Sequence, residues 1–303
     1  MANFPASGAG MTARSLGEVI EGSLVSEPDQ YLIQALCRDP PMHIGSAAHT
    51  LPQAIPSGGV NLNAVLYTAA GSGPHPTMLL LHGLPGNEQN VDLAQTVRRT
   101  GWNVLTIHYR GSWGGPGEFR FEHCLQDAAA ALDWIGEVAG DPALKLDPQR
   151  VAVVGHSMGG FVAAHTAAER PEIKGVALIS GVDLGRAFGD GHSDRSTARV
   201  DENVGVSAGL HILAGTSPPK LANEARINAD RWRLTNYAPH LADRPVLIVT
   251  ADDGFAAGSD ALAYAIRAFD GVQLTHCHFA ADHSYSDCRI GLQVAVLEWL
   301  AKF

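Results

Sequence analysis

A serine between two glycines is the feature of this chain that most clearly indicates chemistry. Ser157 is the third residue of Gly-His-Ser-Met-Gly at 155–159, which follows the apolar run Val-Ala-Val-Val and precedes an Ala-rich, helix-forming stretch. Glycine on either side leaves room for a sharp strand-to-helix turn that raises the hydroxyl above a sheet. The backbone N–H groups that follow begin a helix and point to where an oxyanion would form. Ser157 is therefore predicted to be the nucleophile of an acyl-transfer reaction.

A second match to the pattern Gly-x-Ser-x-Gly surrounds Ser207. A chain with 33 glycines produces such a short pattern easily by chance, so its context has to decide. The residues before Ser207 are polar and do not form a buried strand, and the stretch after it is interrupted by Gly215 and Pro218. We interpret Ser207 as an ordinary loop or lid residue.

The elements that must position Ser157 follow a regular order. From residue 60 onward, short β-branched runs alternate with longer Ala-rich stretches, which predicts a mostly parallel sheet covered by helices on both faces. The four central runs are apolar throughout, as expected of strands buried on both faces. We expect strands at 48–55, 60–68, 77–82, 102–109, 150–155, 173–180, 245–250 and 272–279, and helices at 88–100, 121–138, 158–169, 259–269 and 286–302.

From residue 60 to the C-terminus, this order of elements around Ser157 resembles the α/β-hydrolase family. The resemblance implies an α/β-hydrolase fold whose oxyanion hole is completed by the loop His-Gly-Leu-Pro-Gly at 82–86. The implied donors are the backbone N–H groups of Leu84 and Met158. His82 is interpreted as an organiser of this loop. Arg110, in an Arg-Gly turn after the next strand, is interpreted as structural.

The resemblance also implies a histidine base in the loop after the last strand. A serine hydroxyl is a poor nucleophile until a base accepts its proton, and His283 stands between the run at 272–279 and the C-terminal helix. His276 and His278 lie inside that run, where they are expected to share one face and pack.

An acid is expected after the strand at 245–250, where Asp252 and Asp253 stand side by side. Adjacent residues in an extended segment face opposite ways, so only one of them can accept the imidazole N–H. The usual place of the acid in the family that this chain resembles, two or three residues after the strand, favours Asp253, with Asp252 as the alternative acid. Asp260 and Asp282 are weaker candidates.

The predicted domains are an N-terminal extension at 1–45 and an α/β-hydrolase domain at 46–303, with a lid insertion at about 181–244. Long inserts in compact folds are usually functional. Two aromatic residues of the insertion, Trp232 and Tyr237, are therefore expected to shape the substrate pocket.

The composition excludes several classes of protein. A chain with 46 % hydrophobic residues can bury a large core, and its net charge of −10 argues against nucleic acid and anionic membrane partners. The four cysteines are too widely spread for a disulfide framework or a zinc site. Neither a signal peptide nor a membrane-spanning run is evident, which favours a cytoplasmic location unless a native signal is missing from this chain. No cofactor or metal is expected, and the oligomeric state stays open.

These observations predict a serine hydrolase that cleaves a small-molecule ester through an acyl-enzyme on Ser157. A peptidase or amidase of the prolyl-oligopeptidase-like type and an acyltransferase are the enzymatic alternatives. A ligand-binding protein on a hydrolase scaffold is the non-enzymatic one, and it predicts damage to the triad. Because serine, histidine and candidate acids are all present, catalysis is favoured.

Overall fold

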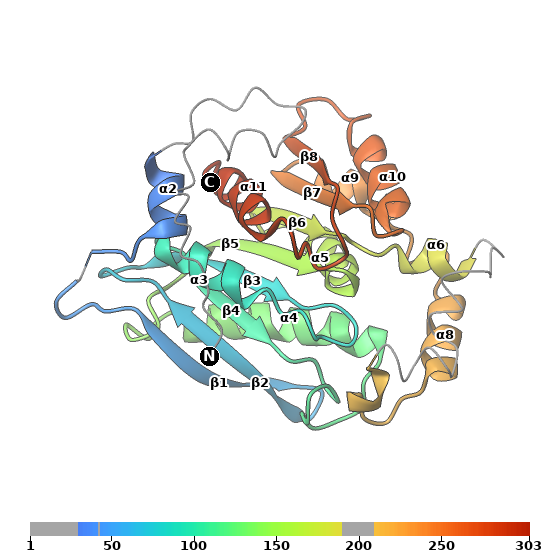
Figure 1. Cartoon of the computed structure of the whole chain (residues 1–303). Coiled ribbons are helices and arrows are strands. Elements are labelled where there is room, and N and C mark those ends of the chain that lie inside the picture. Colours follow the sequence, from blue (N-terminus) through green and yellow to red (C-terminus); the bar gives the residue numbers. More distant parts are fainter. Residues whose placement is uncertain (1–29, 42, 190–208) are drawn as a thin grey trace, which may run out of the picture.

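The computed structural model describes residues 30–41, 43–189 and 209–303. In these residues one eight-stranded sheet has the order β1-β2-β4-β3-β5-β6-β7-β8 (Figure 1). Only the β1–β2 and β2–β4 pairs are antiparallel, which confirms the predicted mostly parallel sheet. The strands are β1 (His49–Ser57), β2 (Val60–Thr68), β3 (His75–Leu81), β4 (Asn103–Ile107), β5 (Leu146–His156), β6 (Gly175–Ile179), β7 (Val246–Ala251) and β8 (Leu274–Phe279).

Helices cover both faces of the sheet (Figure 1). One face carries α2 (Gln30–Cys37), α3 (Val91–Arg99) and α11 (Arg289–Leu300). The opposite face carries α4 (Phe121–Val138), α5 (Met158–Glu169) and α10 (Ala256–Ile266). The shorter described helices are α6 (Leu184–Gly189), α8 (Pro218–Ile227), α9 (Ala238–Leu241) and the 3₁₀ turns η1 (Leu210–Ile212) and η2 (Leu234–Tyr237).

The central strands are apolar throughout because both of their faces are covered. In β3, Leu79 and Leu81 belong to the core beneath α4 and α5, whereas Met78 and Leu80 belong to the core beneath α3 and α11. Successive side chains of a strand point to opposite faces, so a strand between two helical layers has no polar side. These two cores fix the sheet against its helices and hold the strand ends in place.

Two predicted helices begin later than expected, each because a turn precedes it. Helix α3 begins at Val91 rather than at residue 88, since Asn90 has a left-handed backbone with φ of 54°. Helix α11 begins at Arg289 rather than at residue 286, since Tyr285 has φ of 57° and the N–H of Ser286 donates to Asp282 (2.8 Å). Both turns lie beside the candidate site.

A buried ion pair joins the loop after β4 to α4, and a serine of the β1–β2 hairpin bonds to the same carboxylate. The Nε of Arg110 donates to the carboxylate of Asp127 (2.6 Å), and the Ser57 hydroxyl donates to the same carboxylate (2.6 Å). A Cβ at Gly58 would stand 1.7 Å from the Arg110 guanidinium, so only glycine fits there. Arg110 therefore has the structural position that its sequence context indicates.

The predicted insertion at 181–244 contains α6, η1, α8, η2 and α9. Its described part packs against α4, α5 and α10. Ser207, the serine of the second Gly-x-Ser-x-Gly match, and the rest of 190–208 lie outside the described residues.

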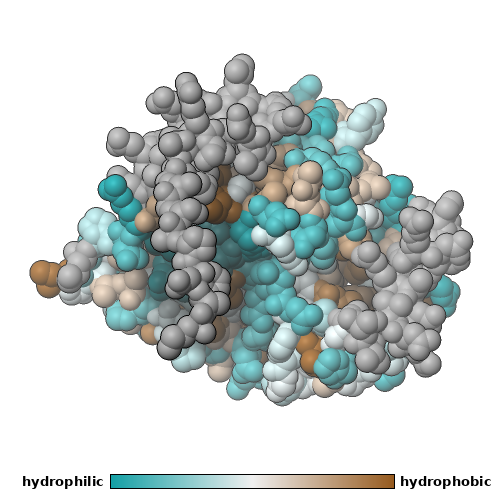
Figure 2. Space-filling view, in the orientation of Figure 1, coloured by the Kyte–Doolittle hydropathy of each residue, from teal (hydrophilic) through white to brown (hydrophobic). Residues whose placement is uncertain are grey.

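Hydrophilic residues cover most of the described surface in the view of Figure 2, and hydrophobic ones lie in small separate areas. Scattered exposed apolar side chains such as Ile44 and Tyr264 are normal in a folded protein. Within the described parts of the chain, no helix combines the length and apolar character needed to cross a membrane.

Candidate active site

The candidate catalytic residues follow the carboxyl ends of neighbouring parallel strands. Ser157 follows β5, Ser180 follows β6, Asp253 follows β7 and His283 follows β8. The loop at 82–86 follows β3, which is paired with β5. The carboxyl ends of parallel strands lie at one edge of a sheet, where open α/β sheets bind their ligands.

Ser157 occupies a strained turn whose neighbours have to be glycine. Its backbone has φ of 59° and ψ of −123°, a conformation that costs a non-glycine residue on the order of 1–3 kcal/mol. A Cβ at Gly155 would lie 1.9 Å from the carbonyl oxygen of Gly159, and a Cβ at Gly159 would lie 2.3 Å from that of Leu81. The N–H of Ser157 donates to the carbonyl of Ile179 (2.9 Å), which holds this turn against β6.

The loop at 82–86 lies directly against the serine. A Cβ at Gly83 would stand 2.7 Å from the Ser157 Cβ and 3.1 Å from its Oγ. The carbonyls of Gly83 and Pro85 accept hydrogen bonds from His82 Nδ1 (2.8 Å) and Trp113 Nε1 (3.0 Å). Because a carbonyl can only accept, the Nδ1 of His82 carries the proton, and burial lowers the pKa of this imidazole to about 4. His82 thus organises the loop.

The two predicted oxyanion donors lie on either side of this contact. Leu84 belongs to the loop, and Met158 is the first residue of α5. In the described loops and caps, the backbone hydrogen bonds use neither of their N–H groups. The arrangement is compatible with an oxyanion hole, and the donor roles of Leu84 and Met158 stay predictions.

The structure brings Asp253, and not Asp252, to His283. The Nδ1 of His283 lies 2.7 Å from Oδ2 of Asp253, whose side chain is 2 % exposed. Asp252 is 68 % exposed and pairs with His278 instead (3.1 Å). Burial by itself would raise the pKa of Asp253, but hydrogen bonds from His283, from Ser180 and from a backbone N–H lower it below its ordinary value. Asp253 is therefore an ionised acceptor for the imidazole.

Rings and a hydrogen bond hold the His283 imidazole in place. Its ring centroid lies 4.8 Å from that of His156 and 4.9 Å from that of Phe255. The Nε2 of His156 also donates to the His283 carbonyl (2.7 Å). Burial and the neighbouring His283 lower the pKa of His156 to about 4. His156 directly precedes Ser157, so as a neutral donor it joins the loop of His283 to the turn at Ser157.

Sequence reasoning missed the support behind Asp253. The Oγ of Ser180 lies 2.8 Å from the Tyr285 hydroxyl, which donates to the carbonyl of Val249 (3.3 Å). Ser180 and Tyr285 are 105 residues apart, so no local pattern joins them. A polar residue at the carboxyl end of a buried strand, as Ser180 is, was the available signal.

Trp232 and Tyr237, which the sequence predicts to shape the substrate pocket, are buried in the structure. Trp232 is 0 % exposed and Tyr237 is 6 % exposed. The ring centroid of Trp232 lies 6.2 Å from that of Phe121 in α4 and 5.5 Å from that of Phe161 in α5. The ring centroid of Tyr237 lies 6.4 Å from that of Phe161. Both aromatic side chains anchor the insertion to the core, because large apolar surfaces are buried against the nearest helices.

The remaining candidates have local partners on the surface. His276 lies 3.0 Å from Asp260, and the hydroxyl of Ser286 donates a hydrogen bond to the carboxylate of Asp282 (2.7 Å). On the edge strand β8, His276 is partly buried and His278 is exposed, and each pairs with a carboxylate from outside the strand. Neither Asp260 nor Asp282 has the place of Asp253 beside His283.

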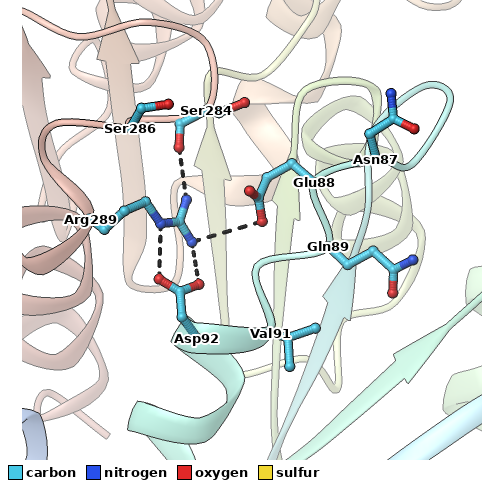
Figure 3. A pocket seen from close by; sticks show the side chains of 8 residues that line it. All are labelled: Asn87, Glu88, Gln89, Val91, Asp92, Ser284, Ser286 and Arg289. Carbon is cyan, nitrogen blue, oxygen red and sulfur yellow. Dashed lines mark hydrogen bonds and ion pairs between the residues drawn. The ribbon is translucent and has the colours of Figure 1, made fainter. Parts of the chain in front are cut away.

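A groove of about 570 Å³, lined mainly by polar residues, lies next to the loop that carries His283 (Figure 3). One side comes from the segment that continues the loop at 82–86, and the other comes from the turn after His283 and the start of α11. Its lining residues are Asn87, Glu88, Gln89, Val91, Asp92, Ser284, Ser286 and Arg289.

The amino-acid sequence is similar to a family model and to known proteins over part of its length. A family model described as the alpha/beta hydrolase fold matches residues 76–201. An uncharacterized protein of Mycobacterium tuberculosis is 34 % identical over 106 residues, which cover 35 % of this chain and 35 % of that protein. The lysophosphatidylserine lipase ABHD12 of Gallus gallus is 31 % identical over 123 residues, covering 39 % of this chain and 30 % of that enzyme. The matches thus span about a third of these relatives' length.

Solved structures share the fold over most of the chain. The thermophilic carboxylesterase EstE1, cloned from a metagenomic library, has a TM-score of 0.60 at 23 % identity and covers 95 % of both chains. The acylaminoacyl peptidase of Pyrococcus horikoshii has a TM-score of 0.62 at 14 % identity, over 84 % of this chain and 41 % of that one. Together with the strand order and the Gly-x-Ser-x-Gly turn, these matches show that the chain has the α/β-hydrolase fold.

Proposed function

We propose that this protein is a serine hydrolase that cleaves small carboxylic esters through an acyl-enzyme on Ser157. The contact that supports this most strongly is the 2.7 Å pair between His283 Nδ1 and the buried Asp253. With Nδ1–H donated to the carboxylate, the Nε2 of His283 is left as an acceptor. A buried Asp-His pair beside a strained serine turn is the arrangement that general-base activation of a hydroxyl requires.

Residues of this chain supply the nucleophile, the base and the oxyanion donors of the proposed reaction. The Oγ of Ser157 attacks the ester carbonyl carbon while His283 Nε2 accepts the hydroxyl proton. The resulting oxyanion accepts hydrogen bonds from the N–H groups of Leu84 and Met158. Collapse breaks the bond to the alcohol, which takes the proton from His283. Water then attacks the acyl-enzyme with His283 as base and releases the acid and free Ser157.

Likeness to a carboxylesterase over 95 % of both chains favours esters as the substrate class. Likeness to an acylaminoacyl peptidase keeps amides as the second candidate, although that match covers only 41 % of the peptidase. Both reactions proceed through the same kind of acyl-enzyme. Ester cleavage requires less protonation of the leaving group, because an alcohol leaves more easily than an amine. The two candidates therefore differ in substrate and not in the residues involved.

A paired substrate panel tests this proposal. Wild-type protein and Ser157→Ala are compared on p-nitrophenyl esters of increasing acyl length and on aminoacyl p-nitroanilides. We expect turnover of short esters by the wild type, little turnover of anilides, and none above background in Ser157→Ala. Preferential anilide cleavage would change the substrate class to amides. Equal activity of the variant would contradict serine catalysis.

A further inference from the structure

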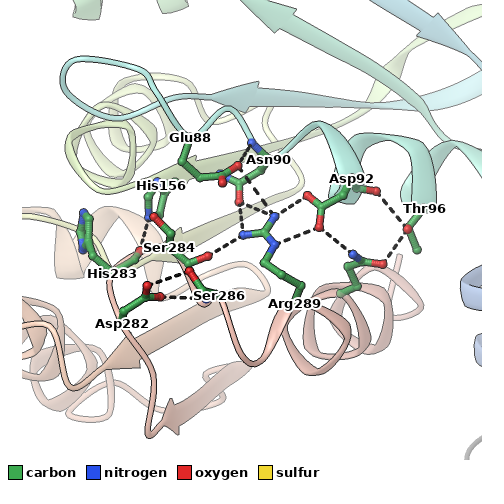
Figure 4. Close-up of polar contacts among 11 residues, drawn as sticks. Glu88, Asn90, Asp92, Thr96, His156, Asp282, His283, Ser284, Ser286 and Arg289 are labelled. Atoms are coloured by element: carbon green, nitrogen blue, oxygen red, sulfur yellow. Dashed lines mark hydrogen bonds and ion pairs between the residues drawn. The ribbon is translucent and has the colours of Figure 1, made fainter. Parts of the chain in front are cut away.

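The guanidinium of Arg289, the first residue of α11, joins segments that lie far apart in the sequence (Figure 4). It forms a bidentate pair with the Asp92 carboxylate, in which Nε donates to Oδ2 at 2.9 Å. Its Nη1 and Nη2 both donate to Oδ1 of Asn90 (3.0 Å each). Nη1 also donates to the backbone carbonyl of Ser284 (2.9 Å). Bidentate guanidinium contacts fix orientation as well as distance.

These partners belong to the two loops that carry the candidate machinery. Ser284 directly follows His283, the candidate base. Asn90 ends the segment that continues from the loop at 82–86, which lies against Ser157. The backbone N–H of Asn90 donates to Glu88 (2.6 Å), which also forms an ion pair with Arg289 (3.9 Å). One side chain therefore bridges the loop after β8 and the loop after β3.

All three guanidinium nitrogens of Arg289 already donate hydrogen bonds within the protein, which argues against an anion-binding role for this residue. Its charge is balanced by Asp92 and Glu88, and its side chain is only 21 % exposed. Burial would lower the pKa of Arg289, but the contacts with Asp92 raise it. A substrate carboxylate or phosphate would have to displace these partners, so a positioning role fits better than ligand binding.

Two successive carbonyls of the base loop are fixed by groups from different parts of the site. His156, next to the nucleophile, donates to the carbonyl of His283, and Arg289 donates to that of Ser284. A shift of the loop would therefore change the imidazole's position relative to both the serine and the loop at 82–86. Misplacement by about 1 Å can cost a catalytic constellation roughly 10²-fold in rate.

We propose that Arg289 is a positioning residue. It sets the distance between the loop after β8, which carries the candidate base His283, and the loop after β3, which carries the predicted oxyanion donor Leu84. This inference rests on the proposed serine-hydrolase function. The groove of Figure 3 is the space that these two loops enclose around the bridge.

The contact between α3 and α11 does not depend on Arg289 alone, so its removal leaves the fold supported. Thr96 in α3 donates to Gln293 in α11 (2.7 Å), and Gln293 donates to Asp92 (2.9 Å). Leu93 and Val97 of α3 are also buried in the core that they share with α11. The consequences for catalysis can therefore be measured in folded protein.

The test compares Arg289→Lys and Arg289→Met with the wild type on a short p-nitrophenyl ester. Lysine keeps the charge but loses the planar fork, and methionine keeps much of the apolar stem alone. Because misplaced oxyanion donors weaken transition-state binding more than substrate binding, kcat should fall about tenfold or more in Arg289→Met. KM should change by less than about threefold, and Arg289→Lys should lie between.

Arg244→Lys is the matched control, because the guanidinium of Arg244, which is buried, also holds backbone carbonyls. Its Nη1 donates to the carbonyls of Ala167 (3.1 Å), Arg170 (3.1 Å) and Ile173 (3.0 Å). Arg244 precedes β7, at the opposite end of that strand from Asp253. Arg244→Lys should lower the melting temperature and leave kcat per folded molecule unchanged.

Two results would overturn the inference. In one, the Arg289 variants lower the melting temperature as Arg244→Lys does but keep wild-type kcat, which makes the bridge merely structural. In the other, KM rises strongly at constant kcat, which makes Arg289 a substrate-binding residue. A wild type that turns over no ester or amide would contradict the proposed function itself, and so it is distinguishable from both.

Discussion

Replacing Asp253 by asparagine should nearly abolish turnover without unfolding the protein. The carboxylate is 2 % exposed and accepts the His283 Nδ1–H at 2.7 Å, so the substituted amide has no solvent to turn toward. An amide NH₂ facing the ring favours the tautomer whose proton sits on Nε2. In that tautomer, His283 has no acceptor for the hydroxyl proton of Ser157.

The size of this effect follows from the role of the carboxylate. Loss of the orienting acid in a serine triad lowers kcat by about 10⁴-fold, which corresponds to roughly 5.5 kcal/mol of transition-state stabilisation. The neighbouring Asp252→Asn is the control, because it removes a carboxylate that is 68 % exposed and pairs with a half-exposed His278. Such surface pairs contribute about 0–1 kcal/mol to stability, and none of that lies at the reacting atoms.

The assay measures kcat on a p-nitrophenyl ester, with Ser157→Ala as the floor and circular dichroism as the test of folding. Asp252→Asn should retain kcat within about twofold, because its contact is solvent-screened. If Asp252→Asn lost most of the activity and Asp253→Asn kept it, Asp252 would be the acid. If neither variant lost activity, the triad reasoning would be refuted.

Three further results are expected. Gly159→Ala should destabilise the protein by on the order of 1–3 kcal/mol in urea unfolding, since its Cβ would stand 2.3 Å from the Leu81 carbonyl, and an unchanged midpoint would contradict this. Burial holds the pKa of both His82 and His156 at about 4, against 6.5 in the unfolded chain, so between these pH values the unfolded state binds more protons. Unfolding free energy should therefore fall as pH drops from 6.5 to 4, by on the order of 3 kcal/mol per histidine, and a flat profile would contradict their buried neutral state. Trp232→Ala should lower the free energy of unfolding by about 3–5 kcal/mol. Trp232→Phe should leave the ranking of ester substrates unchanged, and a changed ranking would show that Trp232 contacts the substrate.

Much of the fold was predictable because its signals are local. The apolar runs of β3, β5, β6 and β7 reflect burial on both faces, and the glycine at 155 reflects a clash with the Gly159 carbonyl that occurs within one turn. The late starts of α3 and α11 were not predictable in the same way. They depend on left-handed residues, Asn90 and Tyr285, neither of which is a glycine that would have marked the turn.

The parts of the site that sequence reasoning missed depend on distant partners. Trp232 was assigned to the pocket because it lies in an insertion, yet its neighbours are rings from α4 and α5 more than 70 residues earlier. Arg289 and Asp92 are 197 residues apart, so no spacing joins them. The choice between Asp252 and Asp253 needed the direction of each side chain, which a backbone turn decides and a pair of identical letters does not.

The central claim, that Ser157 is an activated nucleophile, is tested most directly by a fluorophosphonate. This reagent bonds covalently to a serine Oγ whose proton a base can accept. Mass spectrometry of the digested protein should locate one adduct on the peptide that contains Ser157, with none in Ser157→Ala. An adduct on another residue, or no adduct on folded wild-type protein, would contradict the claim.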